Sequence, residues 1–567
     1  MLIRNHRLHD DCQTWVRLST TFRYPPNLNL FRLANSVVED MAALCSHCVD
    51  FGPEDQLITC DVLDGGQCSP CKERAAIRRQ IKQLKAQHDA IGTAMNAVHD
   101  PFIHKLPPEI GSRILHLSLP TLNNGEHQQK ATPGPASDIW ARPLKLGSVC
   151  RKWRQLVWAT PHLWTILYIG IKPSMTQSMA ESLPGLLHEW LGRTGALPLT
   201  VHFFHKDWDL GLPEDDPEDD PPRDTKTRKN ALEVATGLAI DILNLHSGRW
   251  RNLHLTAGAD IIKRFSSSTE PKQLVCLELA ATPVKALLPM PEFMTESKLN
   301  VTHLKLSRFP LTLINVRWDN ITHATLSEVT IRKGLDLLRQ APSLEYYCLS
   351  TCARRDIGFI NSVLHPRLRS LHLSTSYTER VLNKINLPSL EEWTPNTSGE
   401  RHSIAAMLSF VQRSGCSIKV LNLDNLSTLY EVENLLQKLP SLERLQLCFW
   451  LTEGDEEAVM DDILLRIFDS DSDLTPEPFL PHLQFLECKM GDPVPPFSWH
   501  YIPMLYRNGL RRSFALKAFA SKSHINDETA AQLLQLADEG VDLQIIDQSK
   551  GGDFLENFRN RMHEQEV

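Results

Sequence analysis

The chain has 567 residues, 42% of them hydrophobic and 23% charged, which is the composition of an ordinary globular protein rather than of a fibrous or disordered one. Its length exceeds what one hydrophobic core supports and predicts several domains. The net charge is −8 and no apolar run approaches the ~18 residues of a membrane span, so we expect neither nucleic acid nor a membrane as a partner.

Cysteine usage predicts the cellular compartment. The 13 cysteines are mostly scattered through a chain that is large enough to fold without disulfide bonds. This distribution is typical of reduced thiols, and the first residues lack the apolar run of a secretory signal. We therefore expect a cytoplasmic or nuclear protein.

The N-terminal region divides into two segments. Residues 1–40 show no periodic pattern and are left unassigned, whereas residues 41–71 are rich in cysteine and contain two Cys-x-x-Cys pairs. Two such pairs can supply the four thiolates of a tetrahedral structural zinc site. The alternative is that the thiols are unligated and lie on the surface, because the residues between the pairs lack the strands of a zinc ribbon. No cofactor is required, and the possible zinc ligands are Cys45, Cys48, Cys68 and Cys71.

Residues 72–100 predict a helix with a heptad pattern. Apolar or partly apolar residues recur at alternating spacings of four and three, which is the pattern of a short coiled coil. Two interpretations stay open: the helix pairs with a second copy of itself, or it packs against the next domain of its own chain. The residues of this stripe are Ile77, Ile81, Leu84, His88, Ile91, Met95 and Val98.

Two short amphipathic segments follow within residues 101–167. The first contains "LPPEI", in which Pro108 suits the first helical turn and Glu109 lies near the positive end of the helix dipole. The second is "LGSVCRKWRQLVW", which predicts one helix ended by Pro161, followed by a short turn "PHLW". Three helices this short form a small core, and such a bundle commonly buries its remaining apolar face on a partner.

These two segments resemble the F-box, and more narrowly the F-box proteins expanded in mushroom-forming fungi. The matching motifs are "HDPF" at 99–102, "LPPEI" at 106–110 and "VCRKWR" at 149–154, together with "TP" at 160–161 and "LW" at 163–164. The resemblance implies docking on the Skp-type adaptor of a cullin–RING (SCF) ubiquitin ligase. Carried over by position, it implies the adaptor-binding residues Leu106, Pro107, Ile110, Ile114, Leu117, Val149, Cys150 and Trp153.

Three residues of this module have other expected roles. We expect Leu163 and Trp164 to close the bundle's own core rather than to contact the adaptor. Gly111 departs from the family pattern, which usually has a large apolar residue there. We expect this glycine to remove a contact and to cost about 1 kcal/mol of helix propensity relative to alanine.

The remainder of the chain predicts an α/β repeat array. Residues 168–249 are interpreted as a linking region with an acidic insert at 213–224, and residues 551–567 as a tail. Between them, over residues 250–550, the frame LxxLxL returns in units such as "LVCLEL" and "LERLQL". Leu253, Leu277, Leu304 and Leu326 recur at intervals of 24, 27 and 22 residues, which is the range of leucine-rich repeats. A generic α/β domain is the alternative.

The predicted fold is therefore α/β: an N-terminal helix and a three-helix F-box, followed by an irregular leucine-rich-repeat solenoid with a curved parallel sheet and outer helices. In each unit the leucines point inward, and the residues between them face outward on a broad recognition surface for a protein target. The outward residues are His254, Glu278, Lys305, His372, Asn422 and Gln446.

No catalytic motif is found, and we expect a protein that is not an enzyme. The sequence lacks a phosphate-binding GxxxxGK[ST] loop, an HExxH helix and a GxSxG elbow. The predicted function is an F-box substrate receptor that recruits an unidentified target for ubiquitin-dependent degradation. The alternative is a repeat scaffold that binds partners without any ligase.

Overall fold

The computed structural model describes seventeen stretches of the chain, which fall into two compact units. The first unit comprises Met1–Ala257 and Arg264–Gln273, and the second comprises Gly258–Lys263 and Leu274–Val567. The described residues are 69–99, 106–118, 142–149, 151–206, 223–265, 271–282, 293, 297–351, 361–396, 403–426, 430–449, 459–469, 479–490, 498–506, 515–520, 525–547 and 552–566.

The first unit begins with helices. Helix α3 covers the heptad pattern, and Pro108 starts α5, where the N–H groups of Ile110 and Gly111 both donate to the carbonyl of Pro107. The second amphipathic segment, predicted as one helix, is divided between α7 and α8. These elements are α3 (Ser69–His99), α5 (Pro108–Leu117), α7 (Arg142–Ser148), α8 (Arg151–Trp158) and the 3₁₀ turn η4 (Pro161–Trp164).

The stretch at 168–249, interpreted from sequence as a linking region, contains regular α/β structure. Strands β1, β2 and β3 pair in parallel, and the helices between them begin with ordinary signals such as Thr176, whose hydroxyl accepts from the Met179 N–H. Of the acidic insert at 213–224, only Arg223 and Asp224 lie within the described residues, at the start of α10. The elements are β1 (Ile166–Ile171), α9 (Gln177–Arg193), β2 (Leu199–His205), α10 (Arg223–Leu245), η6 (Ser247–Arg249) and β3 (Trp250–Ala257).

The second unit carries a long, mostly parallel sheet. Its strands follow one another in chain order, and β17 alone among the described pairs is antiparallel to its neighbour β16. The strands are β4 (Cys276–Ala281), β5 (His303–Ser307), β6 (His323–Val329), β7 (Tyr346–Thr351), β9 (Ser370–Ser374), β11 (Glu392–Asn396), β12 (Val420–Leu426), β13 (Arg444–Phe449), β14 (Phe485–Met490), β15 (Ala515–Ala520), β16 (Leu543–Asp547) and β17 (Gly552–Asp553).

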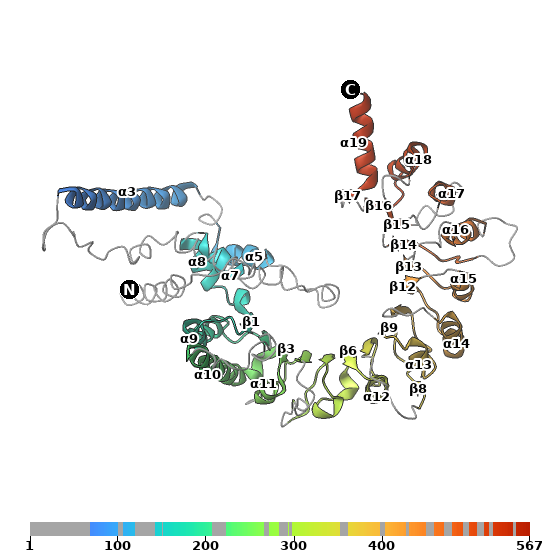
Figure 1. Ribbon diagram of the computed structural model, residues 1–567, viewed down its shortest axis with the longest axis horizontal. Coiled ribbons are helices and arrows are strands. Elements are labelled where there is room, and N and C mark those ends of the chain that lie inside the picture. The colour runs from blue at the N-terminus through green and yellow to red at the C-terminus, as the bar shows by residue number, and fades with distance from the viewer. Residues whose placement is uncertain are drawn as a thin grey trace. The chain divides into compact units, whose positions relative to one another are not determined.

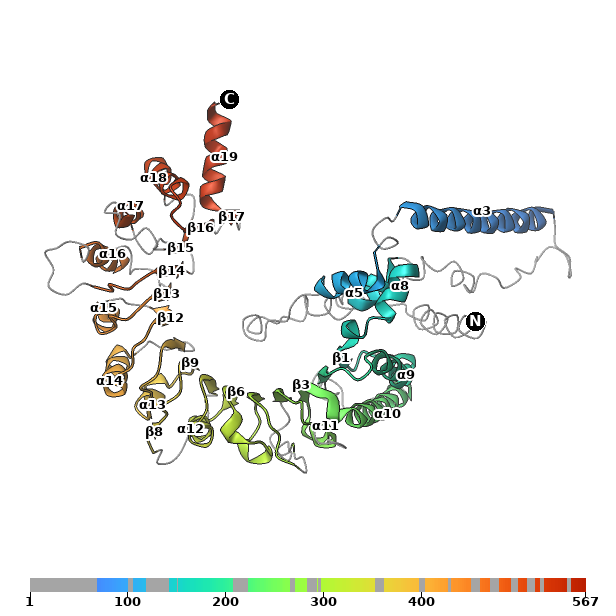
Figure 2. The same cartoon turned by 180° about the vertical axis from the view of Figure 1, so that it is seen from behind.

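Helices and short turns connect these strands. Figures 1 and 2 show that helices α12 to α18 lie on one side of the strands along this unit. A separate pair of short parallel strands, β8 (Val363–Leu364) and β10 (Ile385–Asn386), lies outside the main sheet. The connecting elements are α11 (Ala259–Arg264), η7 (Leu311–Leu313), η8 (Trp318–Asn320), α12 (Ile331–Gln340), α13 (Thr378–Leu382), α14 (Ile404–Ser414), α15 (Tyr430–Gln437), α16 (Val459–Asp469), α17 (Tyr501–Tyr506), α18 (Asp527–Asp538) and α19 (Phe554–Glu566).

The LxxLxL frame explains the register of the sheet. Leu277 pairs with Leu304, and Leu421 pairs with Leu445, so that the alternating leucines of neighbouring strands stack in the same buried layer. Because side chains alternate between the two faces of a strand, the residues between these leucines face the opposite side. No single unit can bury its own leucines, and the core is therefore shared by neighbours along the array. The α/β fold class predicted from the sequence is confirmed.

A second regular feature marks the start of seven of the described strands: β6, β7, β9, β11, β12, β13 and β14. A buried leucine or isoleucine precedes a polar residue, and the N–H groups of that residue and the next both donate to one carbonyl of the preceding unit. For example, the N–H groups of Arg369 and Ser370 donate to the carbonyl of Glu345 at 2.9 Å each. The same pairing uses the carbonyls of Thr302, Thr322, Glu345, Arg369, Glu391, Lys419 and Glu443.

The last residues differ from the predicted tail. Helix α19 begins directly after β17, and Asp553 caps it by accepting hydrogen bonds from the N–H groups of Leu555 and Glu556. Phe554, Leu555 and Phe558 are all buried. The hydrophobic effect therefore fixes this helix against the end of the array.

Candidate functional site

The small bundle of α5, α7, α8 and η4 has its own core. Leu115, Val157, Leu163 and Trp164 are buried together, and Trp153 and Leu156 pack against them while partly buried. The expectation that Leu163 and Trp164 close this core is confirmed, whereas Leu115 was not predicted. Trp153, predicted as an adaptor contact, contributes to this core.

Trp164 joins this bundle to the strands and helices that follow. Its indole N–H donates to the carbonyl of Val157 at 2.9 Å, and the indole N–H of Trp190 on α9 donates to the Trp164 carbonyl at 2.7 Å. The two rings meet edge to face with centroids 4.7 Å apart, and the guanidinium of Arg193 lies 4.8 Å from the centre of the Trp164 ring. These contacts fix the bundle against α9.

Gly111 has a different role from the one expected from sequence. It is buried, and a Cβ atom at this position would lie 2.8 Å from Cδ2 of Leu156 on α8. The glycine therefore allows α5 and α8 to approach closely rather than simply removing a contact. A larger residue here requires either the Leu156 side chain or α5 to shift.

Apolar side chains that the bundle core does not use are exposed. Ile110, Ile114 and Leu117 follow at the spacing of one helix face on α5, and their exposed fractions are 48%, 39% and 66%. Val149, between α7 and α8, is 53% exposed, and Pro107 at the start of α5 is exposed as well. These five residues are called the docking face below.

The other predicted adaptor contacts are less exposed or lie outside the described residues. Leu106 is half-buried, as is Trp153. Cys150 lies outside the described residues. The structure thus gives an unpaired apolar surface to five of the eight predicted contacts, and exposed apolar surface of this kind is typical of protein interaction sites.

The outward side of the sheet forms a second candidate surface. Each predicted outward residue is half-buried rather than fully exposed, because its strand neighbours cover part of it. Their chemistry is mixed: Lys305 forms an ion pair with Glu278 at 3.8 Å, and the amide of Asn422 donates to the Thr394 hydroxyl at 3.1 Å. The predicted residues are His254, Glu278, Lys305, His372, Asn422 and Gln446.

A row of aromatic rings crosses strands β5 to β9 on this side. His303 stacks on His323 with centroids 4.3 Å apart, His323 stacks on Tyr346 at 5.7 Å, and Tyr346 lies 5.1 Å from His372. His303 and His323 also occupy the same local setting, because a preceding threonine hydroxyl lies 2.9 Å from Nδ1 of each ring. We call His303, His323, Tyr346 and His372 the ring row.

Burial shifts the pKa values of the side chains in the ring row. It lowers the pKa of His303, with a smaller contribution from neighbouring His323, and it lowers the pKa of His323 against the opposing effect of Glu345. Burial likewise lowers the pKa of His372, against the opposing effect of Glu392. Burial, together with Cys348 and Glu392, raises the pKa of Tyr346 to about 12. At neutral pH the row is therefore uncharged and presents hydrogen-bonding ring edges.

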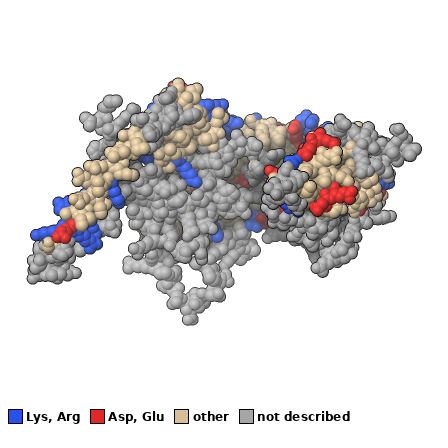
Figure 3. Space-filling view, turned by 90° about the horizontal axis from the view of Figure 1, so that it is seen from above, with Lys and Arg blue, Asp and Glu red and all other residues tan. Residues whose placement is uncertain are grey.

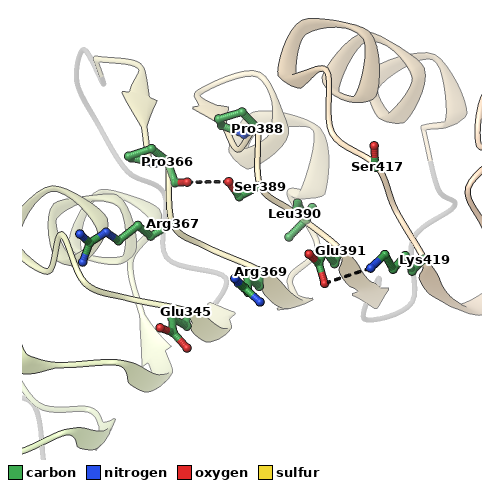
Figure 4. A pocket seen from close by; sticks show the side chains of 10 residues that line it. All are labelled: Glu345, Pro366, Arg367, Arg369, Pro388, Ser389, Leu390, Glu391, Ser417 and Lys419. Atoms are coloured by element: carbon green, nitrogen blue, oxygen red, sulfur yellow. Dashed lines mark hydrogen bonds and ion pairs between the residues drawn. The ribbon is translucent and has the colours of Figure 1, made fainter.

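A shallow hollow of about 410 Å³ lies where strands β7, β9, β11 and β12 begin. Figure 4 shows charged side chains of both signs around it, and the two interactions drawn are the Glu391–Lys419 ion pair at 3.7 Å and the hydrogen bond from the Ser389 hydroxyl to the Pro366 carbonyl at 2.6 Å. Its mixed charges favour neither an anion nor a cation. The lining residues are Glu345, Pro366, Arg367, Arg369, Pro388, Ser389, Leu390, Glu391, Ser417 and Lys419.

The predicted zinc ligands cannot be assembled from the described part of the chain. Cys45, Cys48 and Cys68 lie outside the described residues, and the backbone of Cys71 lies in the first turn of α3. Among the residues that the structure describes, no group of three or more His, Cys, Asp and Glu side chains could hold a metal ion. The zinc site therefore stays a prediction.

The ring row was missed from the sequence, although a signal was present. The dipeptide Thr-His precedes both the "LKL" of β5 and the "ATL" of β6, at positions 302–303 and 322–323. Aligning the units on their buried leucines, rather than only counting their period, brings these histidines into neighbouring positions.

The comparisons with known proteins assign no family to this chain. No protein-family model matches the chain, and a search of curated proteins finds no match. Helices of the length and apolar character that a bilayer requires do not occur among those that the structure describes.

Proposed function

We propose that this chain is an F-box substrate receptor: the small bundle docks on a Skp-type adaptor of a cullin–RING ubiquitin ligase, and the α/β array binds a protein target. The observation that supports this most directly is the docking face. Ile110, Ile114 and Leu117 expose apolar surface along one face of α5, while Gly111 and Leu115 on the adjoining face are buried. The bundle core is complete without these exposed apolar side chains, and they are therefore suited to bind a partner protein.

The docking face has the chemistry of a protein interface rather than of a substrate pocket. Burying apolar surface contributes about 25 cal/mol per Å², so a few isoleucine and leucine side chains supply a useful share of the binding energy. The fixed φ of Pro107, together with the hydrogen bonds from the Ile110 and Gly111 N–H groups to its carbonyl, holds this face in one conformation before binding, which reduces the entropy lost on association.

The array is proposed to be of the leucine-rich-repeat type and to bind the target. Support comes from the recurring buried leucines, the parallel register and the outward rows of mixed polar and aromatic side chains. In this proposal the chain contributes proximity: it holds the target near a ubiquitin-carrying enzyme and does none of the transfer chemistry itself.

Affinity purification with a double variant tests this proposal. The full chain is purified from cells or mixed with a purified Skp-type adaptor, and the adaptor and cullin are detected in the captured material. Leu106→Ala combined with Ile110→Ala is expected to abolish adaptor recovery, because it removes the half-buried and exposed apolar contacts at the start of α5.

The control truncates two apolar residues elsewhere in the chain, both of them exposed. Val234 and Leu245 on α10 are 62% and 69% exposed, and Val234→Ala with Leu245→Ala is expected to leave adaptor recovery unchanged. A second variant, Leu117→Asp, changes the face without touching the bundle core. Adaptor recovery that is equal for all of these variants, or absent for the unchanged chain, would favour the alternative of a repeat scaffold without a ligase.

A further inference from the structure

Helix α3 carries an apolar stripe that the described residues leave uncovered. Ile77, Ile81, Leu84, Ile91 and Met95 are 56%, 48%, 63%, 61% and 51% exposed. Their spacings place them on one side of the helix, and the helix is 31 residues long. Five large apolar side chains in a row, each about half exposed or more, are costly in water unless a partner covers them.

The heptad register assigns each position. With Ile81, His88 and Met95 at position a, the residues Ile77, Leu84 and Ile91 fall at position d. Glu73 then falls at position g and Arg78 at position e of the adjoining heptad. Both of these charged side chains are exposed.

The flanking charges favour a second copy of the same helix in parallel orientation. In a parallel two-stranded coiled coil, a residue at g faces the residue at e five positions later on the other helix. Glu73 of one copy therefore faces Arg78 of the other, and the symmetry of the dimer makes this pair twice. The later g positions are Gln80 and Gln87, so no like-charged g–e pair opposes this arrangement.

An antiparallel arrangement is disfavoured by the same positions. It brings e positions of one helix against e positions of the other, and the charged e residues here are Arg78 and Lys85, which are both cationic. Figure 3 shows Lys and Arg side chains spread along α3. Among the remaining cations, Arg74 falls at position a, one heptad before Ile81 at the start of the stripe, whereas Lys72 and Arg79 fall at the outer position f and Lys82 at position b. The outer side of the helix is thus suited to contact with water, and the apolar stripe is suited to contact with a partner helix.

We propose that α3 pairs with α3 of a second copy as a parallel two-stranded coiled coil, so that the protein is a homodimer. This inference does not rest on the proposed ligase function. Because α5 follows shortly after the end of α3, a parallel pair carries both docking faces at the same end of the coiled coil.

Sedimentation velocity of the full chain over a concentration series tests the proposal. The unchanged chain is expected to sediment as a dimer at micromolar concentration. Leu84→Glu with Ile91→Glu is expected to give only monomer, because it places charges at two d positions. The matched control adds the same charges one heptad apart on the outer side, as Ala86→Glu with Thr93→Glu, and is expected to remain dimeric.

A charge exchange tests the orientation. Glu73→Arg alone and Arg78→Glu alone each place like charges across the seam and are expected to weaken dimerisation about tenfold. Mixing these two variants makes every g–e pair attractive again and is expected to restore a dimer that contains one chain of each. His88→Ile, which replaces a polar residue at position a, is expected to tighten the dimer.

Circular dichroism of each variant checks that α3 remains helical. A monomeric unchanged chain at 100 µM or above, or a dimer that persists in Leu84→Glu with Ile91→Glu, overturns the proposal. Mixing that fails to restore dimers overturns the parallel orientation. Each of these results is independent of adaptor recovery, so dimerisation and the ligase proposal can fail separately.

Discussion

The hydroxyl of Tyr347 on β7 donates a hydrogen bond to the carbonyl of Gly334 on α12, at 2.8 Å and in the buried interior of the second unit. Tyr347 occupies a layer in which the neighbouring strands have Ala324 and Leu371. A ring of this size fits because Gly334 has no side chain: a Cβ there would lie 2.8 Å from both Cδ atoms of Leu349 and 3.2 Å from the Tyr347 hydroxyl.

Replacement of Gly334 by alanine is expected to destabilise the fold by about 1–3 kcal/mol, because overpacking in a filled core outweighs the gain in helix propensity. The matched control is Gly192→Ala on α9, where no atom lies within 4 Å of the added Cβ, and this change is expected to be neutral or stabilising. Urea denaturation followed by circular dichroism measures both. Equal effects of the two variants would contradict the close approach.

Tyr347→Phe removes the hydroxyl while keeping the ring. We expect a loss of about 1 kcal/mol, the usual net contribution of one buried hydrogen bond. The same denaturation experiment measures it, and the midpoint should fall while the slope with urea stays constant. A variant as stable as the unchanged chain would show that this bond contributes little.

The bundle core and the docking face are expected to respond differently to mutation. Trp164→Ala removes a fully buried ring together with its hydrogen bond and should cost about 3–5 kcal/mol. Ile114→Ala removes a partly exposed side chain that the bundle core does not use, and it should cost less than about 1 kcal/mol. Thermal unfolding of the two variants checks this, and a large loss for Ile114→Ala would mean that the docking face is instead part of the fold.

The ring row predicts a fall in stability below neutral pH. Burial holds the pKa values of His303 and His323 below the ordinary 6.5, so the unfolded chain binds more protons than the folded chain as the pH falls through that value. The stability that these neutral rings provide is present above pH 6.5 and is lost as the pH falls through their folded pKa values. Glu345 beside His323 limits the effect by favouring its charged form.

Urea denaturation at pH 7.0 and at pH 5.0 measures this dependence. His303→Gln with His323→Gln is expected to lose less stability between the two pH values than the unchanged chain. An identical loss in the double variant and in the unchanged chain would assign the pH effect to other groups.

The thiols of the array are expected to be unreactive in the folded protein. Burial raises the pKa of Cys276 and of Cys416 to about 11, and complete burial raises the pKa of Cys488 further. Because the thiolate is the reactive species, iodoacetamide at pH 7.5 should label these residues slowly, and unfolding in urea should accelerate labelling. Peptide mass spectrometry reads each site, and fast labelling of Cys488 in the folded chain would contradict its burial.

Much of the second unit could be predicted from the sequence because its signal is both local and repeated. A leucine at every second position forces one face of a strand inward, so the strands around Leu277, Leu304, Leu421 and Leu445 follow from the pattern alone. The same reasoning missed β1 and β2. Their apolar runs "ILYIGI" and "LTVHFF" alternate without the leucine frame and were therefore not counted as units.

The candidate site residues could be predicted from the sequence only where the residue spacing within a single helix determines which side chains are exposed. The exposure of Ile110 and Ile114 follows from their spacing on α5, but the burial of Trp153 and the role of Gly111 depend on how α8 crosses α5. The ring row depends on contacts between units some 20 residues apart, which no single unit contains. A contact between two elements can be predicted only when their relative positions are known. These positions are given by the fold and not by the sequence of either element.

The doubled hydrogen bond at these strand starts has an evolutionary consequence. From β6 to β14, the two N–H groups at the start of each strand of the main sheet donate to the equivalent main-chain carbonyl of the preceding unit. The side chain at that carbonyl varies, as the different residues Thr322, Glu345 and Lys419 show. Because the joint is made by the backbone, recombination can insert or delete a whole unit and leave a valid junction on both sides. A gene encoding such an array can thus change the length and the outward chemistry of its product by unequal crossing-over, while the leucine layer beneath stays continuous.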